Sequence, residues 1–222
     1  MKAALISGGK DSMLALHKAI DSGIKIDLLI TIISKNEFSY MFHRPNAELT
    51  SLQAEALGIR HIFGYTSGEK ELELDDLERI LVDNNVDLLV TGAIESRYQK
   101  DRIDSICKRH NIDSYAPLWH IDPLEELNEL SDRFNVIITQ VSAMGLDESF
   151  LGKRIDKLMI NRLLEVHKKY KINLLFEGGE AESFVLDAPL FKKRIKIEKA
   201  HIEKRGDASI YKIDSAILES KD

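Results

Sequence analysis

The stretch Ala4-Leu5-Ile6-Ser7-Gly8-Gly9-Lys10-Asp11-Ser12 joins a short apolar run to a glycine turn, and the amphipathic run 13–20 follows at once. The apolar run predicts a strand and the amphipathic run predicts a helix, so the glycines lie at a strand-to-helix turn. The first N–H groups of a helix lack intrahelical partners, and the peptide dipoles place a partial positive charge there. The stretch therefore predicts an anion-binding turn.

The residues of this turn each have a chemical use beside an anion. The two glycines have no Cβ and let the backbone approach closely. Ser7 and Ser12 offer hydroxyls, and Lys10 offers a positive charge. Asp11 is a candidate ligand for Mg²⁺, and Asp11 or Ser12 suits the helix cap. The P-loop pattern G-x-x-x-x-G-K-[ST] does not occur in the sequence, so this turn is a different kind of phosphate loop.

The composition narrows the classes of protein. The chain has 222 residues, of which 44% are hydrophobic, and its formal net charge is −6. This is enough for one large or two small domains with a core. A general nucleic-acid binder is usually basic, so RNA is disfavoured as the main partner. The longest apolar run, residues 28–33, is too short to span a bilayer, and no signal-peptide pattern opens the sequence, so we expect a cytoplasmic protein.

Cys107 is the one cysteine of the sequence, which excludes an internal disulfide, a Cys₄ zinc site and a C-x-x-C pair. It shares the apolar side of a predicted helix with Ile103 and Ile106. We therefore expect a buried structural thiol and not a nucleophile.

The first half of the chain alternates strand and helix. Strands are expected at residues 2–6, 26–33, 59–65 and 86–91, and helices at 12–22, from an Asn46 cap to Gly58, from an Asp75-x-x-Glu78 capping box, and around 94–107. This pattern predicts an α/β fold with a doubly wound parallel sheet, whose ligand lies at the C-terminal ends of the strands. Gly92, Ala93 and Glu95 follow one such end, as the glycine turn follows another.

The regular alternation of strand and helix patterns stops at Pro117. We therefore expect domains at residues 1–116 and 117–222, of which the second is a smaller α+β domain. A long helix is expected at 153–171, with Ile155, Leu158, Met159, Leu163 and Val166 on its inner side. Other elements expected here are a helix at 124–134, strands at 136–141 and 173–176, and a hairpin of 195–203 and 208–218 joined at Arg205-Gly206-Asp207.

A second unusual stretch is Phe176-Glu177-Gly178-Gly179-Glu180-Ala181-Glu182-Ser183, which holds three carboxylates around two glycines. Glu180 and Glu182 face the same side if the chain is extended there. Clustered carboxylates repel each other, which suits a bound cation or amine. A solvated acidic turn is the alternative that the local sequence leaves open.

Both unusual stretches resemble known families. Ser7-Gly8-Gly9-Lys10-Asp11-Ser12 resembles the pyrophosphate loop of N-type ATP pyrophosphatases, which cut ATP between the α- and β-phosphates. Residues 176–191, FEGGEAESFVLDAPLF, resemble the E-G-G-E-x-E-[ST]…D-x-P-x-F signature of diphthine–ammonia ligases. Further similar stretches are Ser39-Tyr40-Met41-Phe42-His43, Leu52-Gln53-Ala54-Glu55-Ala56, Thr91-Gly92-Ala93-Ile94-Glu95-Ser96, Ala116-Pro117-Leu118-Trp119 and Gly145-Leu146-Asp147-Glu148-Ser149-Phe150-Leu151-Gly152. Their order and spacing are similar to the archaeal single-module form of that family, although other members often carry an aromatic residue at the position of Ala181.

The resemblance implies a reaction with ATP and Mg²⁺ as cofactors. ATP adenylates the carboxylate of diphthine, a modified histidine on translation elongation factor two, and ammonia displaces AMP to give diphthamide. No glutaminase module fits in this length, so free ammonium is the expected nitrogen source. Diphthine also carries a quaternary ammonium, which suits carboxylates and aromatic faces.

Residue roles follow from positions in these motifs. The candidate catalytic residues are Lys10, Asp11, Glu95 and Glu180. The candidate ATP-binding residues are Ser7, Gly8, Gly9, Lys10, Asp11, Ser12, Gly92 and Ala93, with Asp11 also the candidate metal ligand. The candidate substrate-binding residues are Met41, His43, Trp119, Asp147, Glu177, Glu180 and Glu182. Local hydrogen bonding for His43, core packing for Trp119 and a turn role for Asp147 are the competing explanations.

Two other functions stay open at this stage: a tRNA-modifying or small-molecule N-type ATP pyrophosphatase, and a non-catalytic ATP-binding module. The negative charge and the 177–183 segment disfavour the first, and the intact residues 10–12 disfavour the second. The basic patch of Lys192, Lys193, Arg194 and Lys196 suits either a protein contact or a solvated edge. A homodimer is expected only because symmetric dimers are common.

Overall fold

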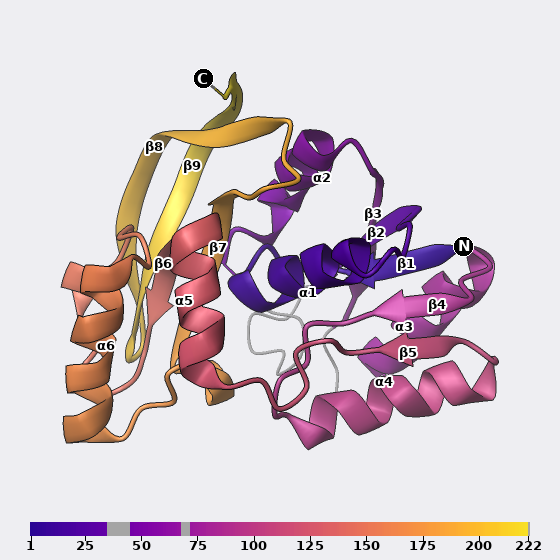
Figure 1. Ribbon diagram of the computed structural model, residues 1–222, viewed down its shortest axis with the longest axis horizontal. Helices are drawn as coiled ribbons and strands as arrows, with labels where there is room; N and C mark the ends of the chain where they lie inside the picture. Colours follow the sequence, from indigo (N-terminus) through magenta and orange to yellow (C-terminus); the bar gives the residue numbers. More distant parts are fainter. Residues whose placement is uncertain (35–44, 68–71, 222) are drawn as a thin grey trace. The chain divides into compact units, whose positions relative to one another are not determined.

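The computed structural model describes residues 1–34, 45–67 and 72–221 (Figure 1). The chain forms two compact units. Unit 1 comprises Met1–Ser7 and Asp11–His120, and unit 2 comprises Gly8–Lys10 and Ile121–Asp222. Three residues of the glycine turn thus group with the C-terminal half of the chain.

Among the described residues, unit 1 is built on a five-stranded parallel sheet with the order β3-β2-β1-β4-β5 (Figure 1). Its strands are β1 (Lys2–Leu5), β2 (Leu28–Ser34), β3 (Arg60–Thr66), β4 (Leu88–Val90) and β5 (Asp113–Tyr115). Its helices are α1 (Lys10–Asp21), α2 (Thr50–Leu57), α3 (Leu72–Asp83) and α4 (Arg97–Arg109), with the 3-10 turn η1 (Ala47–Leu49) before α2. The predicted doubly wound sheet is confirmed, and β5 is a strand that the sequence pattern does not predict.

The core of unit 1 shows why these segments become helices and strands. Apolar residues of β1, β2 and β4 pack with Leu77 and Leu81 of α3 and with Ile103 and Ile106 of α4. These helix residues recur every three or four positions, so one stripe of each helix is buried. Cys107 belongs to the same cluster, which confirms the expected buried thiol.

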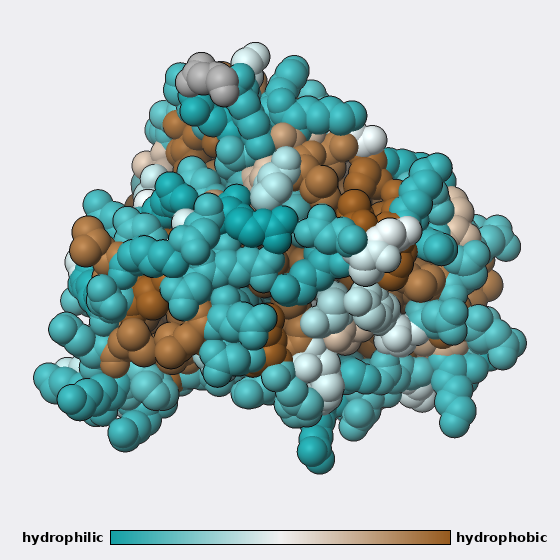
Figure 2. Space-filling view, viewed as in Figure 1, coloured by the Kyte–Doolittle hydropathy of each residue, from teal (hydrophilic) through white to brown (hydrophobic). Residues whose placement is uncertain are grey.

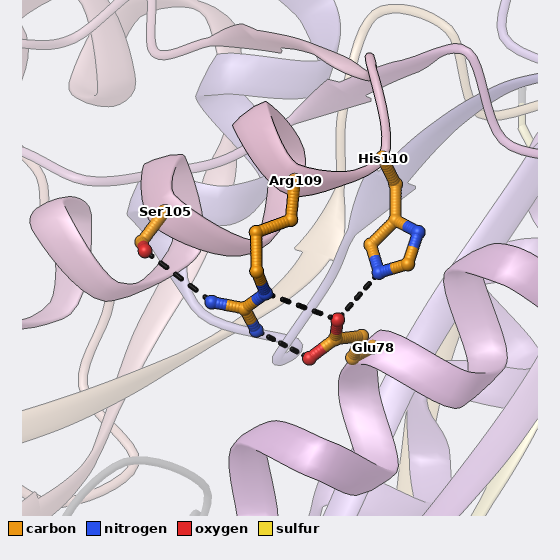
Figure 3. Close-up of polar contacts among 4 residues, drawn as sticks. All are labelled: Glu78, Ser105, Arg109 and His110. Atoms are coloured by element: carbon orange, nitrogen blue, oxygen red, sulfur yellow. Dashed lines mark hydrogen bonds and ion pairs between the residues drawn. The ribbon is translucent and has the colours of Figure 1, made fainter.

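Helices α3 and α4 are also joined by polar contacts around Glu78 (Figure 3). Glu78 is bonded to Arg109 and His110, and Arg109 also donates to Ser105. Hydrogen bonds from Arg109 first, and then from His110, hold the pKa of Glu78 below its ordinary value. The predicted Asp75-x-x-Glu78 capping box is wrong, because α3 already begins at Leu72 and Glu78 bonds to the neighbouring helix.

Over residues 121–221, unit 2 contains a four-stranded antiparallel sheet with the order β7-β6-β9-β8. Its strands are β6 (Asn135–Val141), β7 (Ala181–Asp187), β8 (Lys193–Arg205) and β9 (Ala208–Ser220). Its helices are α5 (Pro123–Arg133) and α6 (Lys157–Tyr170), and its 3-10 turns are η2 (Glu148–Phe150) and η3 (Glu177–Gly179). Helices α5 and α6 pack side by side next to this sheet (Figure 1), which confirms the α+β prediction. The predicted β8–β9 hairpin is present, and Arg194 and Lys196 both pair with Glu219 across it.

Three local predictions are corrected. Asn46 precedes η1 with a φ of 64° and makes no side-chain cap bond. Helix α6 begins later than predicted, because Asp156 caps it through the N–H of Met159, and Leu158 is 80% exposed instead of lying on the inner side. Residues 173–176 form a turn and not a strand, since the Asn173 side chain bonds the N–H of Leu175 and closes the chain on itself.

Hydrophilic residues cover most of the face in Figure 2, with hydrophobic residues in separate patches. In the parts of the chain that the structure describes, no helix has the length and apolar character needed to cross a membrane.

Candidate active site

In unit 1 the order of the strands brings two loops to one edge of the sheet. Strands β1 and β4 are parallel neighbours, with Ala4 opposite Val90. Strand order reverses between them, and this switch point is where ligands of doubly wound sheets bind. Ser7 follows β1 and Gly92 follows β4, so both lie at this C-terminal edge.

Ser7 and Ser12 close the glycine turn from its two ends. The Ser7 N–H donates to Ser12 Oγ over 3.1 Å, and the two hydroxyls lie 3.2 Å apart. Between them Gly8 adopts a φ of 90°, which a side chain would disfavour. The turn therefore presents hydroxyls and a helix start in one short segment, as the sequence predicts.

Gly92 lies against the first turn of α1. A Cβ at this position would fall 2.7 Å from the backbone nitrogen of Ser12 and 2.8 Å from the carbonyl carbon of Asp11. Since backbone atoms cannot give way as a flexible side chain does, only glycine fits here. Gly92 is thus a close-approach glycine.

Asp11 is the carboxylate of the glycine turn. Its carboxylate is half-buried in the first turn of α1. Among the described residues, no group of three or more histidines, cysteines or carboxylates is arranged to hold a metal. Mg²⁺ typically takes one or two protein carboxylates together with substrate phosphates and water, and a single Asp11 suits that arrangement.

The segment after Gly92 turns toward α4. Glu95 is exposed, the carbonyl of Ile94 accepts from the N–H of His120 over 3.0 Å, and Ser96 caps α4. Trp119 is half-buried, with the Lys100 Nζ 5.3 Å from its ring centroid and the His120 ring 4.7 Å away. Trp119 is therefore neither core nor fully exposed.

In unit 2 the side chain of Lys10 is buried. Its Nζ lies 3.1 Å from Glu126 Oε1 on α5, and the two residues are 1% and 0% exposed. The same Nζ lies 5.6 Å from the centroid of the Phe176 ring. Glu126 is a functional candidate that the sequence motifs do not indicate, because it lies beside leucines of an amphipathic helix as the exposed Glu125 does.

The backbone of the glycine turn is bound to β7. The Lys10 N–H donates to Ser183 Oγ over 3.1 Å, and the Val185 N–H donates to the carbonyl of Gly8 over 2.9 Å. Unit 2 thus brings together Gly8 and Lys10 from the first unusual stretch with Phe176 and Ser183 from the second.

The glutamates of the second stretch are arranged differently from the prediction. Glu180 has helical backbone angles (φ −64°, ψ −34°), so the chain is not extended there and alternation does not place Glu180 and Glu182 on one side. A carboxylate oxygen of Glu180 accepts from the N–H of Asn173, and its carbonyl accepts from Ser142. Glu177, Glu180 and Glu182 are half-buried.

Asp147 has the turn role that competed with substrate binding. Its carboxylate accepts from the N–H and the hydroxyl of Ser149 and starts η2. The hydrogen bond from the Ser149 hydroxyl has the largest effect and the one from the Ser149 N–H the next, and both hold the pKa of Asp147 below its ordinary value. Met41 and His43 lie outside the described residues.

Comparisons with known proteins find relatives over most of this chain. A model of the diphthamide synthase N-terminal domain matches residues 1–114, and one of the diphthamide synthase C-terminal domain matches residues 122–218. The protein named diphthine–ammonia ligase from Bos taurus is 36% identical over 225 residues, which are 90% of this chain and 84% of that protein. The protein of that name from Homo sapiens is 33% identical over 90% of this chain and 84% of its own length. The one from Saccharomyces cerevisiae is 29% identical over 94% of this chain but only 36% of its own length.

The resemblance seen in the sequence is confirmed by these matches, which extend over both units. The chain therefore belongs to the diphthamide synthase family, a family of ligases.

Proposed function

We propose that this chain is a diphthine–ammonia ligase that amidates diphthine on translation elongation factor two in the cytoplasm. First, a carboxylate oxygen of diphthine attacks the α-phosphorus of ATP, and pyrophosphate leaves. Then ammonia attacks the acyl carbon, AMP leaves, a proton is lost, and the amide remains. The observation that carries the proposal is the serine–glycine turn at the β1–β4 switch point, with Gly92 against the start of α1.

The turn is assigned to the phosphates of ATP. The hydroxyls of Ser7 and Ser12 and the backbone at Gly8 and Gly9 hold the β- and γ-phosphates and stabilise charge as pyrophosphate leaves. Gly92 and Ala93 run close to the nucleotide. Asp11 holds Mg²⁺, which when bound neutralises phosphate charge. Lys10 belongs to the same loop, and its side chain is buried beside Glu126.

The carboxylates outside the loop are assigned to the two cationic groups of the reaction, the ammonium and the trimethylammonium of diphthine. These carboxylates are Glu95, which is exposed, and Glu177, Glu180 and Glu182, which are half-buried. The further substrate contacts in the proposal are Met41, His43, Trp119 and Asp147.

The single cysteine supports ammonium as the nitrogen donor. A glutaminase normally needs a nucleophilic thiolate, and Cys107 is buried in the core of unit 1. Burial raises its pKa to about 11, so the thiol stays protonated at neutral pH. This chain therefore has no cysteine suited to release ammonia from glutamine.

The test is a pyrophosphate-release assay with ATP, Mg²⁺ and ammonium, with and without elongation factor two that carries diphthine. We expect sustained release of AMP and pyrophosphate only when the factor and ammonium are both present, together with the mass change of an amide on the factor. Binding of ATP without factor-dependent turnover would refute the ligase and redirect the search to RNA or small-molecule acids.

A further inference from the structure

Glu126 and Lys10 form a buried ion pair that the proposed reaction does not yet use. Their charged atoms lie 3.1 Å apart, and almost none of either side chain reaches solvent. A buried charge is tolerated only when it is paired, because removing one partner leaves the other uncompensated in an apolar environment. The ring of Phe176 lies 5.6 Å from the same ammonium and adds a favourable aromatic face.

Lys10 is also bound through its backbone. Its N–H donates to Ser183 Oγ, and two residues earlier the carbonyl of Gly8 accepts from Val185. The segment Gly8–Lys10 is therefore held at three points in unit 2: by α5 through the side chain of Lys10, and twice by β7 through the backbone. A glycine pair has the least resistance to rearrangement, so these attachments define which way the loop backbone points.

We infer that Glu126 is a positioning residue that fixes the phosphate-binding loop by holding Lys10, and that the Lys10 ammonium serves as an anchor and not as a phosphate ligand. The inference rests on the proposed binding of ATP by residues 7–12. If the ammonium left Glu126 to reach a phosphate, the carboxylate would stay buried without its cation. That cost is avoided when the pair stays closed throughout turnover.

Three variants separate an anchor from a phosphate ligand: Lys10→Met, Glu126→Leu and the double variant. We expect each single substitution to raise the KM for ATP about tenfold, with the KM for ammonium unchanged, because each leaves a buried charge that distorts the loop. In the double variant both charges are gone and the apolar side chains pack together, so we expect the KM for ATP to return to within about threefold of its starting value.

The alternatives give different results. If Lys10 binds phosphate, the double variant stays as defective as Lys10→Met. If the pair only stabilises the fold, thermal unfolding shifts but the KM for ATP is unchanged in all three variants. Glu125→Leu is the matched control, since Glu125 is an exposed neighbour on the same helix, and its KM for ATP should not move.

A second variant keeps the test decisive if the single charge variants do not fold. Ser183→Ala removes only the hydroxyl that accepts from the Lys10 N–H, and we expect it to raise the KM for ATP about threefold without affecting ammonium. An unchanged KM for ATP would overturn the inference. If the starting protein shows no factor-dependent turnover, the proposed function fails by itself, and the dissociation constants of ATP for the same variants still test the anchor.

Discussion

The two glycine-containing stretches of this chain use their polar side chains differently. In residues 7–12 the polar groups of Ser7 and Ser12 bond within the turn, and the helix that follows is a regular one. In residues 177–183 they hold other segments: Glu180 bonds the N–H of Asn173, and Ser183 bonds the N–H of Lys10. The two serines of the first stretch therefore close their own turn, whereas Glu180 and Ser183 of the second support neighbouring segments.

Their glycines differ as well. Gly92, beside the first stretch, is required because backbone atoms of Asp11 and Ser12 occupy the place of a Cβ. Gly178 and Gly179 have φ values of 79° and 78°, and a Cβ on either would meet no atom within 4 Å. Steric exclusion explains the first glycine and backbone conformation explains the other two. The following substitutions test this contrast.

The largest effect is expected for Gly92→Ala. The added methyl has to push backbone atoms of α1 aside, which should cost about 1–3 kcal/mol of stability and displace the loop. We expect kcat/KM for ATP to fall about a hundredfold or more, because small displacements of groups that position a substrate greatly reduce the rate. Thermal unfolding and pyrophosphate release measure the two effects.

Gly23→Ala is the control for Gly92→Ala. Gly23 has a φ of 89° and open space around its Cβ position, so the substitution should lower stability by about 1 kcal/mol and leave the KM for ATP unchanged. If Gly92→Ala kept a normal KM for ATP, the close approach of β4 to α1 would not matter for the nucleotide.

The same contrast explains what the sequence could predict. The segment before Ser7 is apolar, and the segment after Ser12 has apolar residues at helical spacing. The strand, the turn and the helix can therefore be predicted in order from the residues. Strand β5 is only Asp113–Tyr115 and has no apolar pattern, so it depends on pairing with β4. The turn at 173–176 is apolar like a strand, but a side-chain bond from Asn173 ends it. The sequence does not reveal the role of Glu126, because its partner Lys10 lies more than a hundred residues away in the chain.

The second prediction separates the structural contact of Glu180 from its proposed role in binding ammonium. Glu180→Ala removes the acceptor for the N–H of Asn173 and should lower the free energy of unfolding by about 1–2 kcal/mol. Glu180→Gln keeps an acceptor oxygen and should retain most of that stability. If the carboxylate also binds ammonium, both variants should raise the KM for ammonium by about tenfold.

Glu165 is an exposed residue of α6, and Glu165→Gln is the control. It should change neither the free energy of unfolding nor the KM for ammonium. A Glu180→Gln variant with normal KM values for ammonium and for the factor would remove Glu180 from the reaction and leave it a structural residue.

A smaller effect is expected for Asp147, whose carboxylate starts η2. Asp147→Ala should lower the free energy of unfolding by about 0.5–1 kcal/mol, as the loss of a cap does, and Asp147→Asn should recover part of it. If the carboxylate only holds this turn, the KM for the factor is unchanged in both variants. A higher KM for the factor with no loss of stability would instead identify Asp147 as a substrate contact.

The smallest effect is expected at Glu78, whose contacts join α3 to α4 and do not involve residues 7–12 (Figure 3). Arg109 and His110 lower the pKa of Glu78 in the folded protein, so folding favours its carboxylate form. That stabilisation is complete above the ordinary pKa of 4.5 and fades as the pH falls through the lowered value. The difference in free energy of unfolding between the starting protein and Glu78→Gln should therefore be largest near neutral pH and shrink in acid. It should also shrink at high salt, because the groups are partly exposed to solvent and are screened by ions. A difference independent of pH would mean that the charge of Glu78 contributes nothing to joining α3 and α4.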